Sequence, residues 1–186
     1  AGCGTGNHLL QTANYFNAKI TGIDLSLSSL AYARRKIDEL ELENIELLHG
    51  DIMQLNTFDK KFDIIESVGV LHHLRNPIKG LSILTNLLEE DGLLLLGLYS
   101  ERARQGIEII KSYAKKNNFH NTLSDIRKFR EKIFNEEKDL DFKNLSNRKD
   151  FFSTSSVRDL IFHSHENTYS LKQIFNMLED LNLEFL

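Results

Sequence analysis

Short apolar runs alternate with amphipathic stretches over the first hundred residues of the chain. Runs that are bounded by turn residues predict strands at residues 19–23, 45–49, 62–68 and 93–98. Strands that are apolar on both faces are typical of a parallel sheet with helices on both sides. The alternation therefore predicts an α/β fold with a doubly wound, mainly parallel sheet and right-handed crossovers.

Two of the intervening helices can be located from their start signals. Ser26 is placed to cap a helix whose apolar positions are Leu30, Ala33, Ile37 and Leu40. Asn76 followed by Pro77 predicts the start of another helix, with an N-cap and a proline in the first turn. The buried face of this second helix would carry Ile78, Leu81, Leu84 and Leu88. Asp91-Gly92 then predicts the turn into the next strand.

The alternation of strands and helices stops at residue 100. We therefore expect residues 1–100 to form the ligand-binding core of the fold. Residues 101–150 predict two helices with charged outer faces, followed by a looser polar stretch over residues 135–150. The apolar positions are Ile107, Ile110 and Ala114 in the first helix and Ile126, Phe129 and Ile133 in the second. Since no strand pattern is visible here, we interpret residues 101–150 as a helical cap inserted into the fold.

Residues 151–186 are expected to return to the core with a C-terminal helix and the start of a strand. Ser170 and Gln173 match a capping box, and Asn182 can end that helix in a left-handed turn. The apolar stripe of the helix comprises Leu171, Ile174, Phe175, Leu178 and Leu181. A glycine loop without the strand that normally feeds it, and a final strand that stops short, predict a fold truncated at both ends.

A candidate ligand site is predicted where strands end. The opening loop carries glycine at positions 2, 4 and 6, so that a ligand can lie against the backbone near a helix N-terminus. Asp24 follows at close to the offset of about 20 residues that separates a glycine loop from a ribose-binding acid. Asp51 can accept from the exocyclic amine of an adenine while Ile52 packs on its ring. Residues 66–73 leave the third strand at the same edge of the sheet.

Together these segments resemble the class I S-adenosylmethionine-dependent methyltransferase family. The resemblance rests on residues 2–6, 22–26, 50–52, 62–65, 69–74 and 88–94. It implies a Rossmann-like methyltransferase fold and S-adenosyl-L-methionine as cofactor, with the methionine part on the glycine loop. The cofactor-binding residues that we predict are Gly2, Cys3, Gly4, Gly6, Asp24, Leu25, Asp51, Ile52, Glu66 and Ser67. The family usually also carries an acid two residues before the first glycine, a position that precedes Ala1.

Methyl transfer mainly requires alignment of the acceptor, and a general base is needed only when the acceptor must lose a proton. His72 and His73 are candidate catalytic bases because histidine titrates near neutral pH; the alternative is that one packs at the strand end and the other contacts the next helix. His163, His165 and Glu166 are candidate acceptor contacts, with an ordinary polar loop as the alternative. Their spacing lacks a clear third metal ligand, so no metal is predicted.

The composition of the chain limits which classes of partner we expect it to bind. The chain has 186 residues with a net charge of −4, which gives no overall field that would attract nucleic acid or an anionic membrane. The densest basic group, Arg127, Lys128, Arg130 and Lys132, is diluted by acidic neighbours. The single cysteine, Cys3, excludes an intrachain disulfide and agrees with a cytoplasmic setting. No apolar run approaches the roughly 18 residues that suggest a membrane span.

The sequence therefore predicts a cytoplasmic methyltransferase that acts on a small-molecule or protein acceptor, with the acceptor atom and the oligomeric state left open. One alternative is a module that binds S-adenosylmethionine without turnover, since its donor site would look the same. A nicotinamide-dependent oxidoreductase is a second alternative, against which Asn7 and Asp51 argue. An aminopropyl transferase is a third, but no suitable pair of amine-binding acids is apparent in the sequence.

Overall fold

The computed structural model describes residues 1–15, 17–135, 140–163 and 165–186. These residues form two compact units. The first unit comprises residues 1–98 and 175–186, and the second comprises residues 99–174.

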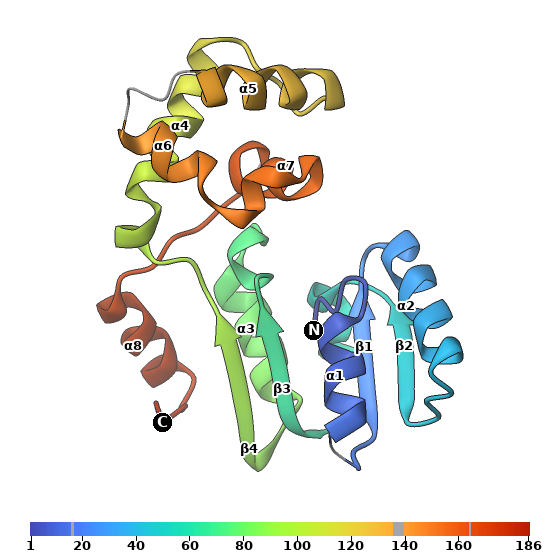
Figure 1. Ribbon diagram of the computed structural model, residues 1–186. Coiled ribbons are helices and arrows are strands. Elements are labelled where there is room, and N and C mark those ends of the chain that lie inside the picture. The colour runs from blue at the N-terminus through green and yellow to red at the C-terminus, as the bar shows by residue number, and fades with distance from the viewer. Residues whose placement is uncertain (16, 136–139, 164) are drawn as a thin grey trace. The chain divides into compact units, whose positions relative to one another are not determined.

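Parallel strands organise the first unit (Figure 1). Strand β1 (Ile20–Asp24) pairs with β2 (Ile45–His49), and β3 (Phe62–Val68) pairs with β4 (Leu88–Gly97). Within the described residues the two pairs form separate two-stranded sheets. The predicted strands at 45–49 and 62–68 are confirmed, and the first predicted strand lies one residue later than expected.

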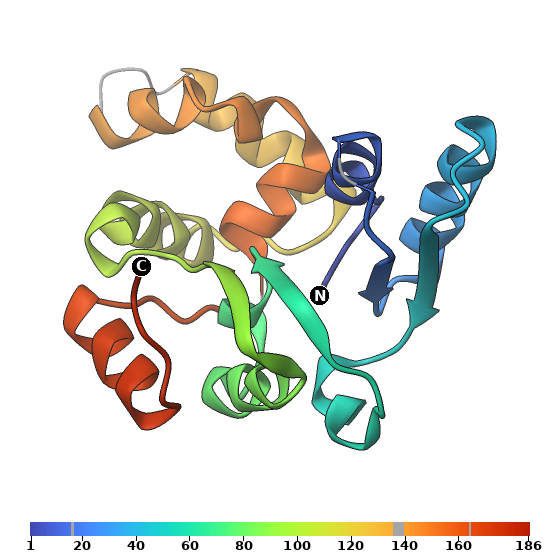
Figure 2. The same cartoon turned by 90° about the horizontal axis from the view of Figure 1, so that it is seen from below.

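Helices lie on both faces of these strands, as a doubly wound arrangement requires (Figures 1 and 2). Helices α1 (Asn7–Tyr15) and α2 (Leu27–Glu39) contact each other and β1 on one face, whereas α3 (Pro77–Asn86) packs on β4 from the other. The short 3-10 helices η1 (Ile52–Thr57) and η2 (Leu71–His73) connect strands to helices and contact α3.

Both predicted helix starts are confirmed by their caps. The hydroxyl of Ser26 accepts from the backbone N–H of Ser29 at 3.2 Å, and the side chain of Asn76 accepts from that of Lys79 at 3.1 Å. Each contact satisfies one of the N–H groups that the first turn of a helix leaves free. The predicted buried positions 30, 33, 37, 81 and 84 are buried, whereas 40 and 78 are exposed because they lie at helix ends.

The transition from α3 to β4 differs from the prediction. The helix ends at Asn86, and the strand begins at Leu88 rather than at residue 93. Leu88 is buried as the first strand residue and not as the last position of a helical stripe. Pairing with β3 is irregular here, and a Cβ at Gly92 would lie 2.7 Å from the side chain of Leu88. Residues 89–92 form a bulge within the continuous strand β4, so the predicted turn at Asp91-Gly92 into the strand is wrong.

The second unit is helical, with α4 (Glu101–Lys116), α5 (Leu123–Asn135), α6 (Leu140–Ser146), η3 (Lys149–Phe152) and α7 (Thr154–Phe162). Its core comprises Ile107, Ile110, Ala114, Ile126, Phe129, Ile133, Phe142, Leu145, Phe151, Val157, Leu160 and Ile161. All six predicted core positions of the first two helices are confirmed. The predicted polar stretch over residues 135–150 is wrong at α6, because Phe142 and Leu145 are buried there. Positions 136–139 of that stretch lie outside the described residues.

Helix α8 (Leu171–Asp180) begins at the predicted capping box. The backbone N–H of Ser170 donates to Gln173 Oε1 at 2.8 Å. The backbone N–H of Gln173 donates in turn to the Ser170 hydroxyl at 3.4 Å. The left-handed turn at Asn182 is confirmed by its φ of 52°. Of the predicted apolar stripe, Leu171 and Phe175 are exposed, and residues 183–186 carry no strand in the structure.

Candidate functional site

The glycine loop lies at the carboxyl end of β1, where the backbone N–H groups of Gly2 and Cys3 both donate to the carbonyl of Ile23. All three loop glycines have positive φ, between 53° and 80°, which favours glycine. A Cβ at Gly2 would lie 2.3 Å from Val70, and one at Gly6 would lie 2.8 Å from Ala33. A Cβ at Gly4 would meet nothing within 4 Å. The outer glycines therefore allow close packing, and the middle one presents bare backbone to open space.

Asp24 holds this loop to the end of β1. Its Oδ2 accepts from the backbone N–H of Gly4 at 2.7 Å, and its Oδ1 accepts from that of Ser26 at 2.8 Å. A carboxylate offers about four acceptor positions, so two contacts leave room for further donors such as ribose hydroxyls. The sequence predicted only the ribose contact. The contact with Ser26 had a sequence signal, since aspartate often bonds to the backbone two residues on, but the contact with Gly4 spans 20 residues and had none.

The predicted adenine side of the site lies at the end of β2. The backbone N–H of Gly50 donates to the carbonyl of Asp24 at 3.1 Å, which joins the ends of β1 and β2. Asp51 caps η1 through Oδ1, which accepts from the backbone N–H of Met53 at 2.9 Å. Ile52 is buried, whereas Leu25 is 64% exposed. Of these two side chains, Leu25 is therefore the one that offers apolar surface at this edge.

Glu66 and Ser67 lie side by side on β3 but face opposite ways, as neighbouring strand residues do. The carboxylate Oε2 of Glu66 lies 2.7 Å from Nδ1 of His8, in the first turn of α1. Ser67 is completely buried, and its hydroxyl has no hydrogen-bond partner among the described residues. The role of His8 could not be predicted from the sequence, because no local pattern links it to Glu66, which is 58 residues away.

The thiol of Cys3 is not an activated nucleophile. Burial, followed by the charge of Asp24, raises the pKa of the Cys3 thiol. A raised pKa keeps the thiol protonated near neutral pH, and the thiolate is the reactive form. Cys3 therefore belongs to the loop as a small side chain.

The two candidate bases lie on η2 and differ in exposure. His72 is completely buried, and His73 is half-buried. Their rings meet edge to face with centroids 4.3 Å apart. A general base must come within hydrogen-bonding reach of the proton that it removes. Of this pair, only His73 keeps some exposed side-chain surface, and its Nε2 atom is itself buried.

The three candidate acceptor contacts belong to the helical unit, where the structure gives them different surroundings. Glu166 accepts from Arg104 Nε and from Lys111 Nζ, each at 2.6 Å, and its side chain is 5% exposed. Burial alone would raise the pKa of Glu166, but hydrogen bonds and charges from Arg104 and Lys111 outweigh it and lower this pKa. Nδ1 of His163 instead lies 2.8 Å from the carbonyl oxygen of His165 in a local turn.

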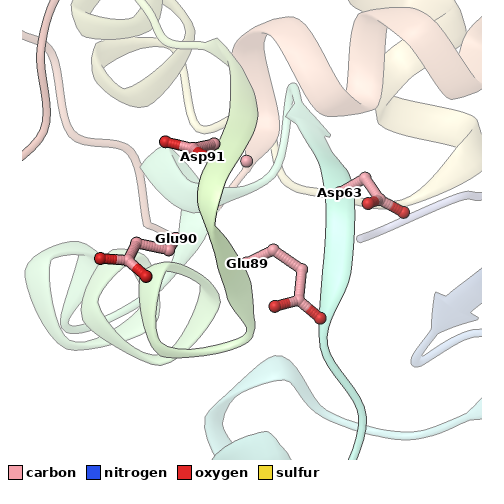
Figure 3. A pocket seen from close by; sticks show the side chains of 5 residues that line it. Asp63, Glu89, Glu90 and Asp91 are labelled. Carbon is pink, nitrogen blue, oxygen red and sulfur yellow. The ribbon is translucent and has the colours of Figure 1, made fainter.

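An acidic hollow lies at the opposite, amino-terminal ends of β3 and β4 (Figure 3). It encloses about 370 Å³ and is lined by Asp63, Glu89, Glu90, Asp91 and Gly92. Figure 3 shows the labelled carboxylates pointing in different directions rather than toward one point. Cation sites need convergent oxygen ligands, so this hollow is not a candidate site.

Comparison with known proteins assigns the family. Residues 1–149 match the model of a family described as methyltransferase domain. The chain is 37% identical over 114 residues to the uncharacterized protein syc1184_c of Synechococcus sp., covering 58% of this chain and 26% of that protein. It is 34% identical over 114 residues to the ubiquinone biosynthesis O-methyltransferase of Glaesserella parasuis, covering 59% of this chain and 48% of that protein. The chain therefore spans about a quarter to a half of the length of these relatives.

The fold is that of solved methyltransferases. The structure of PKMT2 from Rickettsia typhi matches with a TM-score of 0.74 and 20% identity, over 97% of this chain and 36% of that one. PKMT2 has also been solved in complex with AdoHcy, which is S-adenosylhomocysteine. The chain belongs to the methyltransferase domain family, and both the predicted family and the Rossmann-like α/β fold are confirmed. Of the helices that the structure describes, none is both long and apolar enough to cross a bilayer.

Proposed function

We propose that this chain forms the donor-binding part of an S-adenosylmethionine-dependent methyltransferase that acts on a small-molecule acceptor. The observation that carries the proposal is the bare backbone of Gly4, which faces open space beside the carboxylate of Asp24. Family membership supports the activity. The names of the curated relatives, which include ubiquinone biosynthesis and (S)-tetrahydroprotoberberine methyltransferases, support a small-molecule acceptor.

The residues around the loop fit the cofactor. Gly4 leaves space against the backbone for the methionine part, and Asp24 keeps acceptor positions for the ribose hydroxyls. Leu25 offers apolar surface to a flat ring, and Asp51 lies at the end of the adjoining strand to accept from the adenine amine. S-adenosylmethionine supplies a methyl group that is already activated by the positive charge on sulfur.

The protein has little covalent chemistry to perform in such a reaction. Its residues hold the reactants in line and exclude water, which together supply most of the rate enhancement. His73 is the candidate base when the acceptor is a hydroxyl that must lose a proton, because it lies on η2 after β3 and is the less buried of the two histidines. An amine acceptor that is already unprotonated needs no such base.

Formation of S-adenosylhomocysteine from S-adenosylmethionine tests the proposal, with the full-length protein and a panel of small phenols, quinols and amines. We expect formation above the acceptor-free rate with at least one class of acceptor. Asp24→Asn should reduce it, and Asp38→Asn is the matched control because Asp38 is an exposed carboxylate on α2. A protein that binds S-adenosylhomocysteine but never exceeds the acceptor-free rate would instead be a binding module. Preferential binding of NAD would contradict the proposal altogether.

A further inference from the structure

The carboxylate of Glu66 lies next to the glycine loop. The carbonyl oxygen of Glu66 is 2.5 Å from the nitrogen of Ala1, which directly precedes Gly2. Its side chain reaches His8 in α1, the helix that begins immediately after Gly6. Glu66 therefore contacts both ends of the glycine loop. Its backbone carbonyl contacts Ala1 before the loop, and its side chain contacts His8 after it.

Only one of the two carboxylate oxygens is occupied by that contact. Oε2 of Glu66 lies 2.7 Å from Nδ1 of His8, and the Glu66 side chain is 37% exposed. Oε1 of Glu66 makes no hydrogen bond within the part of the chain that the structure describes. The imidazole of His8 thus fixes the orientation of the carboxylate and leaves its second oxygen accessible.

We propose that Glu66 binds the ammonium group of the donor's methionine part, and that His8 is a positioning residue that holds Glu66 in place. This inference rests on the proposed function, because it assigns a partner to one end of the same ligand. Neither the family match nor the named relatives assign a role to His8.

The assignment follows from how the carboxylates at the loop are used. Both oxygens of Asp24 already accept backbone N–H groups, from Gly4 and Ser26, and its remaining acceptor positions suit the ribose. An ammonium group carries three donors and no acceptor, so it needs an anion or carbonyl oxygens. Glu66 is the other carboxylate that the structure places at this loop, and charge-assisted hydrogen bonds of this kind are roughly twice as strong as neutral ones.

The test compares two ligands that differ in the amino-acid part. S-adenosylhomocysteine carries the ammonium group, whereas 5′-methylthioadenosine has the same nucleoside and sulfur without it. Calorimetric titration of the full-length protein with each ligand gives a ratio of the two affinities. A role in ammonium binding changes this ratio, whereas general damage to the site lowers both affinities together.

We expect Glu66→Gln to weaken S-adenosylhomocysteine binding about tenfold, with 5′-methylthioadenosine little changed. His8→Ala should weaken it about threefold, and His8→Asn should restore much of the loss because its amide can donate from near the position of Nδ1. Glu46→Gln is the matched control, since Glu46 is a half-exposed carboxylate that pairs with Lys60 at 2.8 Å. It removes the same charge away from the loop.

The outcomes separate this inference from the proposed function. A folded wild-type protein that binds neither ligand would overturn the proposed function itself. Wild-type binding of both ligands, with an affinity ratio that Glu66→Gln leaves unchanged, would overturn the assignment of Glu66 alone. A ratio that depends on Glu66 but not on His8→Ala would remove His8 as the positioning residue.

Discussion

Replacing Glu166 by glutamine tests how the helical unit is held together. The substitution keeps the shape of the side chain but removes the charge that Arg104 and Lys111 share, each at 2.6 Å. The side chain of Arg104 is only 6% exposed, so its guanidinium would remain as a buried charge without its anion. Removal of one partner from a buried ion pair typically costs about 3–5 kcal/mol of stability.

The structure favours the lower end of this range. Arg104 retains a long hydrogen bond to the carbonyl of Leu160 at 3.4 Å and lies 3.8 Å above the ring of Tyr99. Lys111 is 17% exposed and retains Glu108 at 3.1 Å, so it can turn toward solvent. We therefore expect a loss of about 3 kcal/mol in the free energy of unfolding at neutral pH.

Urea unfolding of the full-length protein, followed by circular dichroism, measures this loss as a lower transition midpoint. Glu39→Gln is the matched control, because Glu39 accepts from Lys36 at the same 2.6 Å but on the exposed face of α2. Exposed pairs contribute little, so the control should unfold like the wild type. Equal midpoints for Glu166→Gln and Glu39→Gln would refute the reasoning.

The same contact predicts a dependence on pH. The pKa of Glu166 is lowered in the folded state, so the stabilisation is complete above the unfolded-state pKa of about 4.3. It is lost as pH falls through the lower pKa of the folded state. The difference between the wild type and Glu166→Gln should therefore shrink on acidification below about pH 4.3, and a constant difference would contradict this assignment.

Three further substitutions test the glycine loop and the helical core. Gly4→Ala should cost only about 1–2 kcal/mol in thermal unfolding, from its left-handed backbone, but should weaken S-adenosylhomocysteine binding in calorimetry because its Cβ projects into the ligand's space. Gly6→Ala should also lower the melting temperature by forcing its Cβ to 2.8 Å from that of Ala33. Phe129→Ala should cost about 3–5 kcal/mol in urea unfolding, because Phe129 is completely buried and meets three other rings, and a loss below 1 kcal/mol would contradict its place in the core.

The parallel strands and the main helices were predictable because their signals are local. Continuous apolar runs give strands that are covered on both faces, and Ser26, Asn76 and Ser170 mark helix starts with side chains that can bond to nearby N–H groups. Leu88 was misassigned since one apolar residue fits either a helical stripe or the start of a strand. The choice depends on pairing with Phe62, which is distant in sequence.

Part of the candidate site could be proposed from the sequence, and part depends on the tertiary fold. Glycines and Asp24 stand at spacings that their chemistry requires, so the sequence indicates them directly. The contact between His8 and Glu66 and the engagement of Glu166 by two cations depend on side chains that are 55 or more residues apart. Such contacts follow from the tertiary fold and leave no periodic pattern in the sequence.

Calorimetric titration of S-adenosylhomocysteine into the full-length wild-type protein tests the central claim most directly. We expect one site per chain with a dissociation constant in the micromolar range or tighter, and NAD should not compete for it. A protein that is shown to be folded by a cooperative thermal transition, yet gives no heat of binding with S-adenosylhomocysteine, would contradict the assignment of the glycine loop as the donor site.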